Sequence, residues 1–563
     1  MRQARGPLKS AIWRIHHLFQ YGAGMNSTRS ARQSVRKTLA RQTLLNTALC
    51  CLVCLGFSPA RMLAQTQDTL TLGNAGEPQT LDPHRYNLRL EETILTDLFL
   101  GLTAMNAKGN IVPGAAEAWT VSEDGLVWTF SLRQALKWSD GRPLTADDFV
   151  YSFRRLLDPS TAASLAYFMY PIENARAVNA GELPPSELGA IATDPHTLTL
   201  ILEEPYPHLP ERLLYPTGFA VPGHLIERVG DDWVKAGNWV SNGAYVLDEW
   251  RPQSHVALKA NPQFHETVAI DRVRYLPLAN EQNAYNRYRA GEAHAIGGFP
   301  ANELAHVRET MPEHLRVSPL LSMIYLVFNT TAPPFDDARV REALALVVQP
   351  EVLTEKVQRT GNYAARSFVP FLVEGSDAPS PNYHEEPPAE RFARARQLLE
   401  AAGFDRNNPL EVTLRYYDAG DGKRTNLAIA SFWQQIGVTT RIHHTELKVH
   451  FTDLRQGDFQ VAQAGWIGEN NPGHYLDLLV SDAGNVNYGG YRNAAYDELM
   501  SRARKQADIE ERYRLMQAAE ALAMSEYPVV PLWSVAVKRL VNPDLKGWHE
   551  NHRDVHAVRF LSW

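Results

Sequence analysis

Alternation of apolar and polar residues predicts several strands, each with one buried face. Residues 127–132 read Val-Trp-Thr-Phe-Ser-Leu, with large apolar side chains at every second position. Because successive side chains of a strand point to opposite faces, this period of two places one face against a core. The same pattern occurs over residues 197–202, 255–260 and 272–278.

A period near 3.6 residues predicts helices in other parts of the chain. Residues 390–402 gather apolar side chains on one face, and Gly403 follows as a typical C-terminal stop. Asp336 or Asp337 can cap a helix that runs through Val347. A helical pair is predicted over residues 496–507 and 510–524. The mixture of strands and helices indicates the α/β class, with two lobes and a third piece.

The first 64 residues have the composition of an export signal. They contain ten basic residues and no Asp or Glu, and they include an apolar run over residues 44–57. This run is shorter than the roughly 20 residues of a membrane-spanning helix, which favours a signal peptide over an uncleaved anchor. Residues 58–60 and 62–64 are candidate cleavage sites, and Met25 is a candidate true start.

Export changes both the cysteine content and the charge. Cys50, Cys51 and Cys54 all lie in the apolar run, so the mature chain has no disulfide and no thiolate site. The residues before Cys54 fit a lipoprotein signal poorly, which favours a soluble periplasmic protein. Taking the ten basic leader residues from the 56 of the chain leaves 46 against 63 acidic residues, a net charge of −17. Such an acidic protein is not expected to bind nucleic acid.

The mature chain is long enough for several domains, but its sequence shows no linkers between them. About 499 residues follow the leader, which suggests roughly three domain-sized units. No glycine- and serine-rich linker and no internal repeat separates them. This continuity predicts a chain that passes back and forth between lobes.

Motifs of common enzyme classes are missing. The sequence has no Walker loop, no dinucleotide fingerprint, no Gly-x-Ser-x-Gly elbow and no His-Glu-x-x-His. His552 and His556 could share a helix face and bind a metal, but the charges around them favour a solvated terminal segment. His443 and His444 lie in a predicted strand and point to opposite faces. We therefore expect no catalytic site, no metal site and no cofactor.

Six segments occur in an informative order along the mature chain. They are residues 76–84 (Gly-Glu-Pro-Gln-Thr-Leu-Asp-Pro-His), 113–119 (Pro-Gly-Ala-Ala-Glu-Ala-Trp), 138–151 with its Trp-Ser-Asp-Gly turn, 242–245 (Asn-Gly-Ala-Tyr), 335–344 and 464–469 (Ala-Gly-Trp-Ile-Gly-Glu). Each is weak alone, and the turns over 137–145 and 238–245 are more typical of scaffold than of a site. Together, at these separations, they resemble the periplasmic oligopeptide-binding proteins of ABC importers, solute-binding protein family 5.

The resemblance implies a fold and its boundaries. The fold would be the two-lobed α/β periplasmic-binding-protein (Venus-flytrap) fold, with an additional α/β domain inserted in the first lobe. Lobe I would comprise residues 66–98, 222–321 and 538–563, the extra domain II residues 99–221, and lobe III residues 322–537. The chain would cross between lobes near Leu321-Ser322 and Ala536-Val537.

The resemblance also implies how a peptide would be held. An extended peptide lies between the lobes as an added strand, so main-chain groups supply affinity. A buried acid pairs with the ligand's α-ammonium, and Glu469 stands at the matching position, where the family usually has Asp. Gly465, Trp466 and Ile467 would offer backbone groups, with Trp466 lining a side-chain pocket. A solvated loop carboxylate and a core tryptophan are the alternatives for Glu469 and Trp466.

The basic residues of the family's site are altered in this chain. Gln463 stands where many relatives have Arg, and Leu454, beside Arg455, stands at a second such position. Arg424 is a basic residue left near the implied site. The candidate ligand-binding set is thus Glu469, Trp466, Gly465, Ile467, Gln463, Arg424, Arg455 and Asn87. A Lys position falls at Gln358, and the family's cysteine pair is replaced by Ser322 and Ile467.

The expected function follows from the resemblance. The chain would be a monomeric periplasmic receptor, without enzymatic activity, that delivers a peptide or peptide-like ligand to an inner-membrane ABC permease. The altered basic set also fits a modified peptide, a cell-wall peptide or an opine-like conjugate. The alternatives are the same fold with a non-peptide ligand (opine, sugar, metal chelate or haem), and a periplasmic hydrolase or chaperone-like factor.

Overall fold

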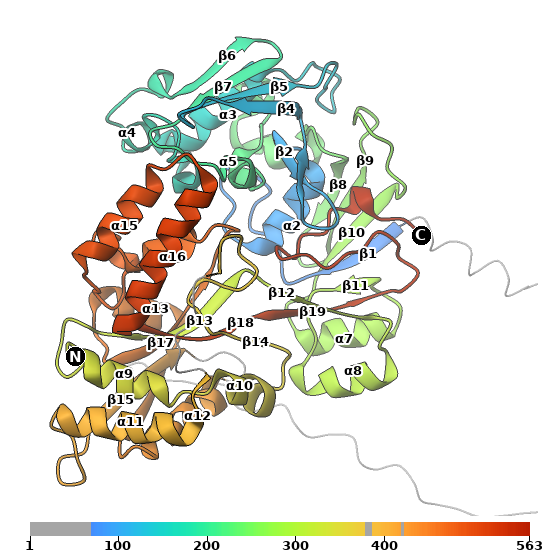
Figure 1. The fold of residues 1–563 in the computed structure, drawn as a ribbon. Coiled ribbons are helices and arrows are strands. Elements are labelled where there is room, and N and C mark those ends of the chain that lie inside the picture. The colour runs from blue at the N-terminus through green and yellow to red at the C-terminus, as the bar shows by residue number, and fades with distance from the viewer. Residues whose placement is uncertain (1–68, 378–384, 418–421) are drawn as a thin grey trace, which may run out of the picture. The chain divides into compact units, whose positions relative to one another are not determined.

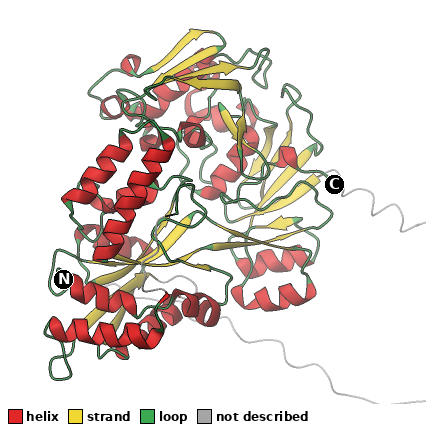
Figure 2. Ribbon diagram, in the orientation of Figure 1, coloured by secondary structure: helices red, strands yellow, loops and turns green. Residues whose placement is uncertain are grey.

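The computed structural model describes residues 69–377, 385–417 and 422–563 (Figure 1). Asp68–Trp563 form one compact unit. The predicted signal peptide, the three cysteines and Met25 lie outside the described residues. The described chain contains both helices and strands in all its parts, as Figure 2 shows.

A seven-stranded mixed sheet forms the centre of lobe I. Its strand order is β12-β19-β11-β1-β10-β9-β8, in which β1 runs parallel to β10 and β11 and the other neighbours are antiparallel. The strands are β1 (Thr69–Asn74), β8 (Tyr245–Arg251), β9 (His255–Ala260), β10 (Arg272–Pro277), β11 (Ala295–Ile296), β12 (Leu315–Pro319) and β19 (Ala536–Val541). Helices α2 (Arg89–Leu98), α6 (Gly223–Val229), α7 (Glu281–Arg289) and α8 (Leu304–Thr310) belong to the same part of the chain.

The extra domain is built on a four-stranded antiparallel sheet. Its order is β4-β5-β7-β6, formed by β4 (Ala116–Val121), β5 (Val127–Leu132), β6 (Ala190–Asp194) and β7 (Thr197–Ile201). A short hairpin, β2 (Thr103–Met105) and β3 (Ile111–Pro113), precedes it, and the helices are α3 (Ala146–Leu157), α4 (Ala175–Asn179) and α5 (Leu209–Arg212). Thr145 and Asp148 form a capping box that begins α3. The buried face of α3 packs against β6 and β7.

Lobe III contains a six-stranded sheet covered by helices on both faces. The order is β14-β18-β13-β17-β15-β16, with β15 parallel to β16 and β17. The strands are β13 (Ser322–Phe328), β14 (Tyr363–Ala364), β15 (Glu411–Tyr417), β16 (Thr439–Thr445), β17 (Val461–Ile467) and β18 (Val529–Ser534). The helices are α9 (Ala338–Leu346), α10 (Pro350–Val352), α11 (Pro388–Ala401), α12 (Gly422–Gln434), α13 (Leu447–Gln456), α14 (Gly473–Leu476), α15 (Ala494–Arg504) and α16 (Ile509–Glu526).

Strand β13 shows why this sheet is covered on both faces. Met323, Tyr325 and Val327 belong to one hydrophobic cluster, whereas Leu326 and Phe328 belong to another. Side chains of a strand alternate between faces, so an almost wholly apolar strand supplies both cores.

Two segments connect the lobes and hydrogen-bond to each other. The first joins β12 to β13 through Leu320 and Leu321, and the second joins β18 to β19 through Val535. The amide of Leu320 donates to the carbonyl of Val535 at 2.9 Å, and the amide of Val535 donates to Ser322 Oγ at 3.0 Å. The predicted domain boundaries themselves stay predictions.

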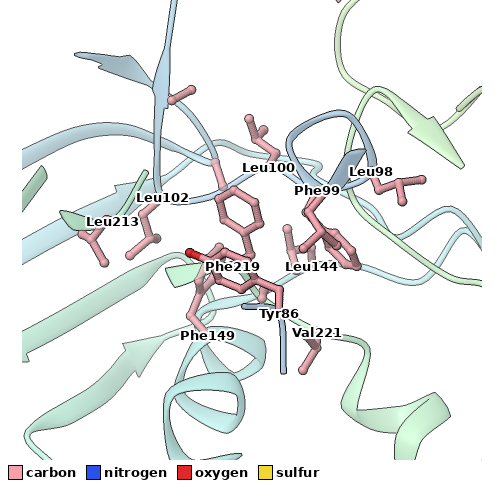
Figure 3. Close-up of a cluster of buried hydrophobic side chains, with 14 of the residues drawn as sticks. Tyr86, Leu98, Phe99, Leu100, Leu102, Leu144, Phe149, Leu213, Phe219 and Val221 are labelled. Atoms are coloured by element: carbon pink, nitrogen blue, oxygen red, sulfur yellow. The ribbon is translucent and has the colours of Figure 1, made fainter. Parts of the chain in front are cut away.

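Lobe I and the extra domain share one hydrophobic core. Phe99 and Phe219 stack with ring centroids 6.3 Å apart, and Phe149 of α3 lies in the same cluster. Figure 3 shows these rings with Tyr86 and the surrounding leucines. A continuous core makes these two parts one body, so lobe III is the separate second lobe.

The segment Leu81-Asp82-Pro83-His84 serves as scaffold. Arg155 of α3 donates to both carboxylate oxygens of Asp82, at 3.1 and 2.7 Å, and to His84 Nδ1 at 2.9 Å. His84 Nε2 donates to the carbonyl of Phe219 at 3.2 Å. This network ties the start of lobe I to the extra domain.

The two turn segments are also scaffold, and they meet. The amide of Ser139 donates to the carbonyl of Ser241 at 2.9 Å. The Asn242 side chain exchanges two hydrogen bonds with the backbone of Leu100. A Cβ on Gly243 would lie 2.4 Å from the backbone of Leu98, so only glycine permits this close approach.

Candidate ligand-binding site

The end of strand β17 positions the candidate site. The amide of Gly468 donates to the carbonyl of Leu321 at 2.8 Å, which continues the pairing of β17 with β13 by one residue. A Cβ on Gly468 would lie 2.4 Å from the buried ring of Tyr475. Glycine at this position therefore lets the chain turn inward, and the next residue, Glu469, is carried between the lobes.

Glu469 is buried and paired with the extra domain. Its side chain is 0% exposed, and its Oε2 lies 2.9 Å from Arg212 Nη2. Tyr206 joins them, because its hydroxyl accepts from Arg212 Nη2 at 2.6 Å and donates to Glu469 Oε2 at 3.3 Å. The alternative of a solvated loop carboxylate is therefore not what the structure shows.

The environment of Glu469 favours its ionised form. Burial acts to raise the pKa of Glu469, but the nearby positive groups, with Arg212 the largest contributor, together outweigh burial, and the pKa falls below its usual value. The amide of Glu469 donates to His474 Nδ1 at 2.9 Å, so the proton of this neutral histidine sits on Nε2. Glu469 Oε1 is buried and accepts no hydrogen bond from any described residue. This oxygen is a ready acceptor for a ligand donor.

Further contacts join the extra domain to lobe III around this pair. The amide of Asn470 donates to Glu211 Oε1 at 2.9 Å, and Arg512 of α16 donates to the carbonyl of Pro205 at 3.1 Å. Burial and the charge of Glu469 raise the pKa of Glu211 to about 7. The carboxylate of Glu469 is thus enclosed at an interface between the two lobes.

A pocket of about 250 Å³ lies next to this interface. Both lobes contribute to its wall, which is mainly aromatic and aliphatic with a few polar side chains. Its lining residues are Tyr86, Asn87, Leu88, Arg89, Glu92, Leu165, Tyr167, Phe168, Tyr215, Leu320, Leu321, Trp466, Ile467, Gly468, His474, His552 and Arg553. Concave, largely apolar sites with few polar groups are typical of small-ligand pockets.

Trp466 and Arg553 both line the pocket wall. Trp466 Nε1 is buried without a hydrogen-bond partner among the described residues, and the ring meets His474 edge-on with centroids 5.6 Å apart. Arg553 lies 4.0 Å from the centre of the Tyr215 ring and donates to Glu92 at 2.8 Å. The Trp466 N–H is therefore a donor that a ligand oxygen can use.

The structure divides the predicted ligand-binding residues into two groups. Asn87, Trp466 and Ile467 line the pocket, and Ile467 is 61% exposed. Glu469 follows directly in the chain. The other predicted residues lie elsewhere in lobe III.

The second group belongs to the far part of β17 and to helices α12 and α13. Gln463 is buried, and its Oε1 accepts from Asn426 of α12 at 2.7 Å. Arg424 donates to the carbonyl of Gln358 at 3.5 Å, and Arg455 is exposed in the last turn of α13. Gly465 faces Ile324, which a Cβ would meet at 2.7 Å. A ligand role for these four residues stays a prediction.

The residues that sequence reasoning missed come from the extra domain. Tyr206, Glu211 and Arg212 lie in the stretch Pro-His-Leu-Pro-Glu-Arg-Leu-Leu-Tyr-Pro, residues 207–216 with Tyr206 just before it. Two charges inside an apolar, proline-rich segment indicate buried and paired groups, because unpaired charges are rarely buried. The partner of these charges is far away in sequence, so this signal does not identify it.

The C-terminal histidines take part in other contacts. His556 bonds to Asp554 at 3.1 Å and stacks on Trp548 with centroids 4.0 Å apart. Burial lowers the pKa of His552, a pocket residue, to about 4. Across residues 69–377, 385–417 and 422–563, no group of three His, Cys, Asp or Glu side chains is placed to hold a metal ion. No helix in this described part of the chain is long and apolar enough to cross a membrane.

Two α/β lobes with a pocket and an enclosed carboxylate between them define a solute-binding protein. Residues 110–487 match the model of the bacterial extracellular solute-binding proteins, family 5 Middle, and the chain belongs to this family. The predicted two-lobed fold and family are confirmed.

Several known proteins are similar to this chain over most of their length. The periplasmic oligopeptide-binding protein OppA of Salmonella typhimurium is 36% identical over 497 residues, which cover 87% of this chain and 91% of that protein. The probable deoxycholate-binding periplasmic protein YgiS of Escherichia coli is 35% identical over 496 residues, 87% of this chain and 92% of that protein. The solved structure of the periplasmic murein tripeptide-binding protein MppA, in its unliganded open form, has a TM-score of 0.80 at 34% identity and covers 88% of this chain and 97% of that one.

Proposed function

We propose that this protein is a periplasmic receptor that captures a peptide or peptide-like ligand between its lobes and delivers it to an ABC import permease. The observation that carries the proposal is the buried Glu469 carboxylate, whose Oε1 has no partner among the described residues, beside a pocket lined by both lobes. The similarity to OppA and MppA, which are named for peptide binding, supports the ligand class.

The mechanism is closure of two bodies around a ligand. Lobe I and the extra domain share a core, and the two connecting segments allow lobe III to move against them. A ligand that contacts both lobes favours the closed arrangement by its differential affinity for it. Binding of this kind makes and breaks no covalent bond, so the proposal includes no enzymatic step.

The pocket wall suggests how such a ligand would be held. Trp466 Nε1 and His474 Nε2 are donors that suit carbonyl or carboxylate oxygens, and Glu469 Oε1 is an acceptor that suits an N–H or O–H group. The rings of Tyr86, Phe168 and Tyr215 offer apolar surface. A peptide carries all three kinds of group.

Export and assembly complete the proposal. The predicted signal peptide would deliver the chain to the periplasm, where OppA, YgiS and MppA are named to reside. We propose a monomer that meets its permease with a ligand enclosed. The relatives of this family supply the support for the importer partnership.

The test is to identify the natural ligand and then remove its acceptor. The full chain is expressed in a bacterium, recovered from the periplasm, and the small molecules released by denaturation are identified by mass spectrometry. Peptides or amide-containing conjugates are expected. Calorimetry with the identified molecule should show that Glu469→Ala lowers affinity strongly and that Glu469→Gln, which keeps one acceptor oxygen, lowers it less, whereas the exposed Glu390→Gln serves as the control.

Two results contradict the proposal. One is the release of molecules without any amide bond. The other is wild-type affinity in both Glu469 variants.

A further inference from the structure

The positive charge opposite Glu469 comes from the protein itself. Arg212 belongs to α5 of the extra domain, and its Nη2 lies 2.9 Å from Glu469 Oε2. Tyr206 bonds to both side chains. In this closed arrangement, the carboxylate therefore already has a counter-charge from the protein itself.

Arg212 is held firmly where it is. Its guanidinium lies 4.8 Å from the centre of the Phe168 ring and 5.3 Å from that of Tyr206, and Nη1 donates to the carbonyl of Phe168 at 3.4 Å. The side chain is only 10% exposed. Displacing Arg212 from Glu469 would leave a guanidinium charge buried among aromatic rings without its partner, which is costly.

Most of the other ionisable groups near this pair are paired or neutral, while the buried Arg512, which donates to the carbonyl of Pro205, adds a positive charge. Arg553 is paired with Glu92 at 2.8 Å. Burial lowers the pKa of His208 to about 4 and also lowers the pKa of His474, so both are neutral near pH 7. Burial, together with the Glu469 charge, raises the pKa of Glu211 to about 7. An additional ammonium at Glu469 would add a further positive charge to an enclosed region that already holds the Arg212 and Arg512 guanidiniums.

We propose that Arg212 determines specificity at this end of the site, so that the ligand group reaching Glu469 Oε1 is an uncharged hydrogen-bond donor instead of an ammonium. An amide N–H or a hydroxyl meets this requirement. The ligand class is then a peptide whose amino end is acylated, or another amide-bearing solute without a free amine there. This inference rests on the proposed function, because it names the ligand class of the same site.

The test compares two peptides that differ only in the charge of the amino end. Trialanine and N-acetyl-trialanine are titrated by calorimetry into the wild-type protein, Arg212→Gln, and the control Arg514→Gln, which changes an exposed arginine of α16. Wild type and the control should bind the acetylated peptide at least about tenfold more tightly. Arg212→Gln should reverse this preference, because Glu469 then lacks a counter-charge and gains most from an ammonium. A wild-type preference for free trialanine, or a preference that Arg212→Gln leaves unchanged, overturns the inference.

A measurement without ligand tests the Arg212–Glu469 pair even if a variant is unstable or neither peptide binds. The melting temperatures of wild type, Arg212→Gln, Glu469→Gln and the double variant form a thermodynamic cycle. If the pair forms, the double variant should lose less than the sum of the two single losses; additive losses overturn the inference. Failure of both peptides to bind wild type contradicts the peptide function instead, and the cycle then still decides whether Arg212 neutralises Glu469.

Discussion

Arg155 and Asp82 form a bidentate ion pair that connects the extra domain to the first residues of lobe I. The guanidinium donates to both carboxylate oxygens at 3.1 and 2.7 Å, and the side chains are 10% and 4% exposed. Bidentate geometry and burial make this pair unlike the many surface ion pairs of the molecule, whose contribution is small.

We expect Asp82→Ala to lower the free energy of unfolding by roughly 3–5 kcal/mol, because it leaves the Arg155 charge buried without a partner. Urea unfolding measures this loss, with the exposed Glu123→Gln as the control. Burial acts to raise the pKa of Asp82, but the hydrogen bond and charge of Arg155 hold it below its usual value. The stabilisation should therefore be present above about pH 4 and decline as pH falls through the folded-state pKa. An equal loss at pH 7 in Asp82→Ala and in the control would contradict this role.

Glu520 should make the protein less stable as pH rises. Its Oε1 accepts from the amides of Phe368 and Val369 at 2.7 and 2.8 Å, and burial raises its pKa to about 7 despite these bonds. The folded state binds this proton more tightly than the unfolded state, so stability falls between about pH 4.5 and 7. Glu520→Gln keeps the accepting oxygen and removes the charge.

The Gln variant should equal wild type near pH 4.5 and exceed it by about 1–3 kcal/mol at pH 8. Chemical unfolding at several pH values measures the difference. The exposed Glu390→Gln is a matched control that should not change the slope. A constant difference between Glu520→Gln and wild type across this range would show that Glu520 is ionised in the folded protein.

Gly468→Ala should damage both stability and ligand binding. The added methyl would meet the Tyr475 ring at 2.4 Å, and this ring is fully buried. Either the ring or the segment carrying Glu469 must move, so we expect a loss of about 1–3 kcal/mol. Gly237→Ala is the control, because a Cβ there meets nothing within 4 Å. Unfolding and calorimetry on both variants test this, and wild-type behaviour of Gly468→Ala would mean that the turn tolerates a side chain.

Trp466 should contribute to ligand binding through both its ring and its N–H group. We expect Trp466→Phe to weaken binding of the co-purifying ligand moderately and Trp466→Ala to weaken it by at least about tenfold, because only the former keeps an aromatic wall. The amount of ligand retained per protein, measured by native mass spectrometry, reports both effects. Equal retention in all three proteins would place the ligand away from this wall.

Much of the secondary structure follows from local patterns. The strands over 127–132 and 255–260 match β5 and β9, and the helix expected after Asp337 begins there because Asp337 accepts from the amide of Arg339 at 2.9 Å. Hydrophobic periodicity and helix caps depend on residues that are close in sequence, so both can be recognised in a single sequence. The helical pair over 496–507 and 510–524 likewise appears as α15 and α16.

Only the part of the site that lobe III contributes could be predicted from the sequence. Residues 464–469 are contiguous, and the structure places Trp466, Ile467 and Glu469 at the interface between the lobes. Arg212 reaches the same point from another domain, and neither periodicity nor spacing connects residues so distant in sequence. Interactions of this kind depend on how domains pack, which local patterns do not encode.

The shared core around Phe99 and Phe219 joins lobe I and the extra domain into one body, and two segments connect this body to lobe III. Under the proposed closure mechanism, movement of lobe III against this body changes the separation of Arg212 from Glu469, which are in contact in this structure. One pair of fluorescent labels, one on each body, would report the opening of the receptor. A permease would distinguish the loaded from the empty receptor by the orientation of lobe III relative to the other body.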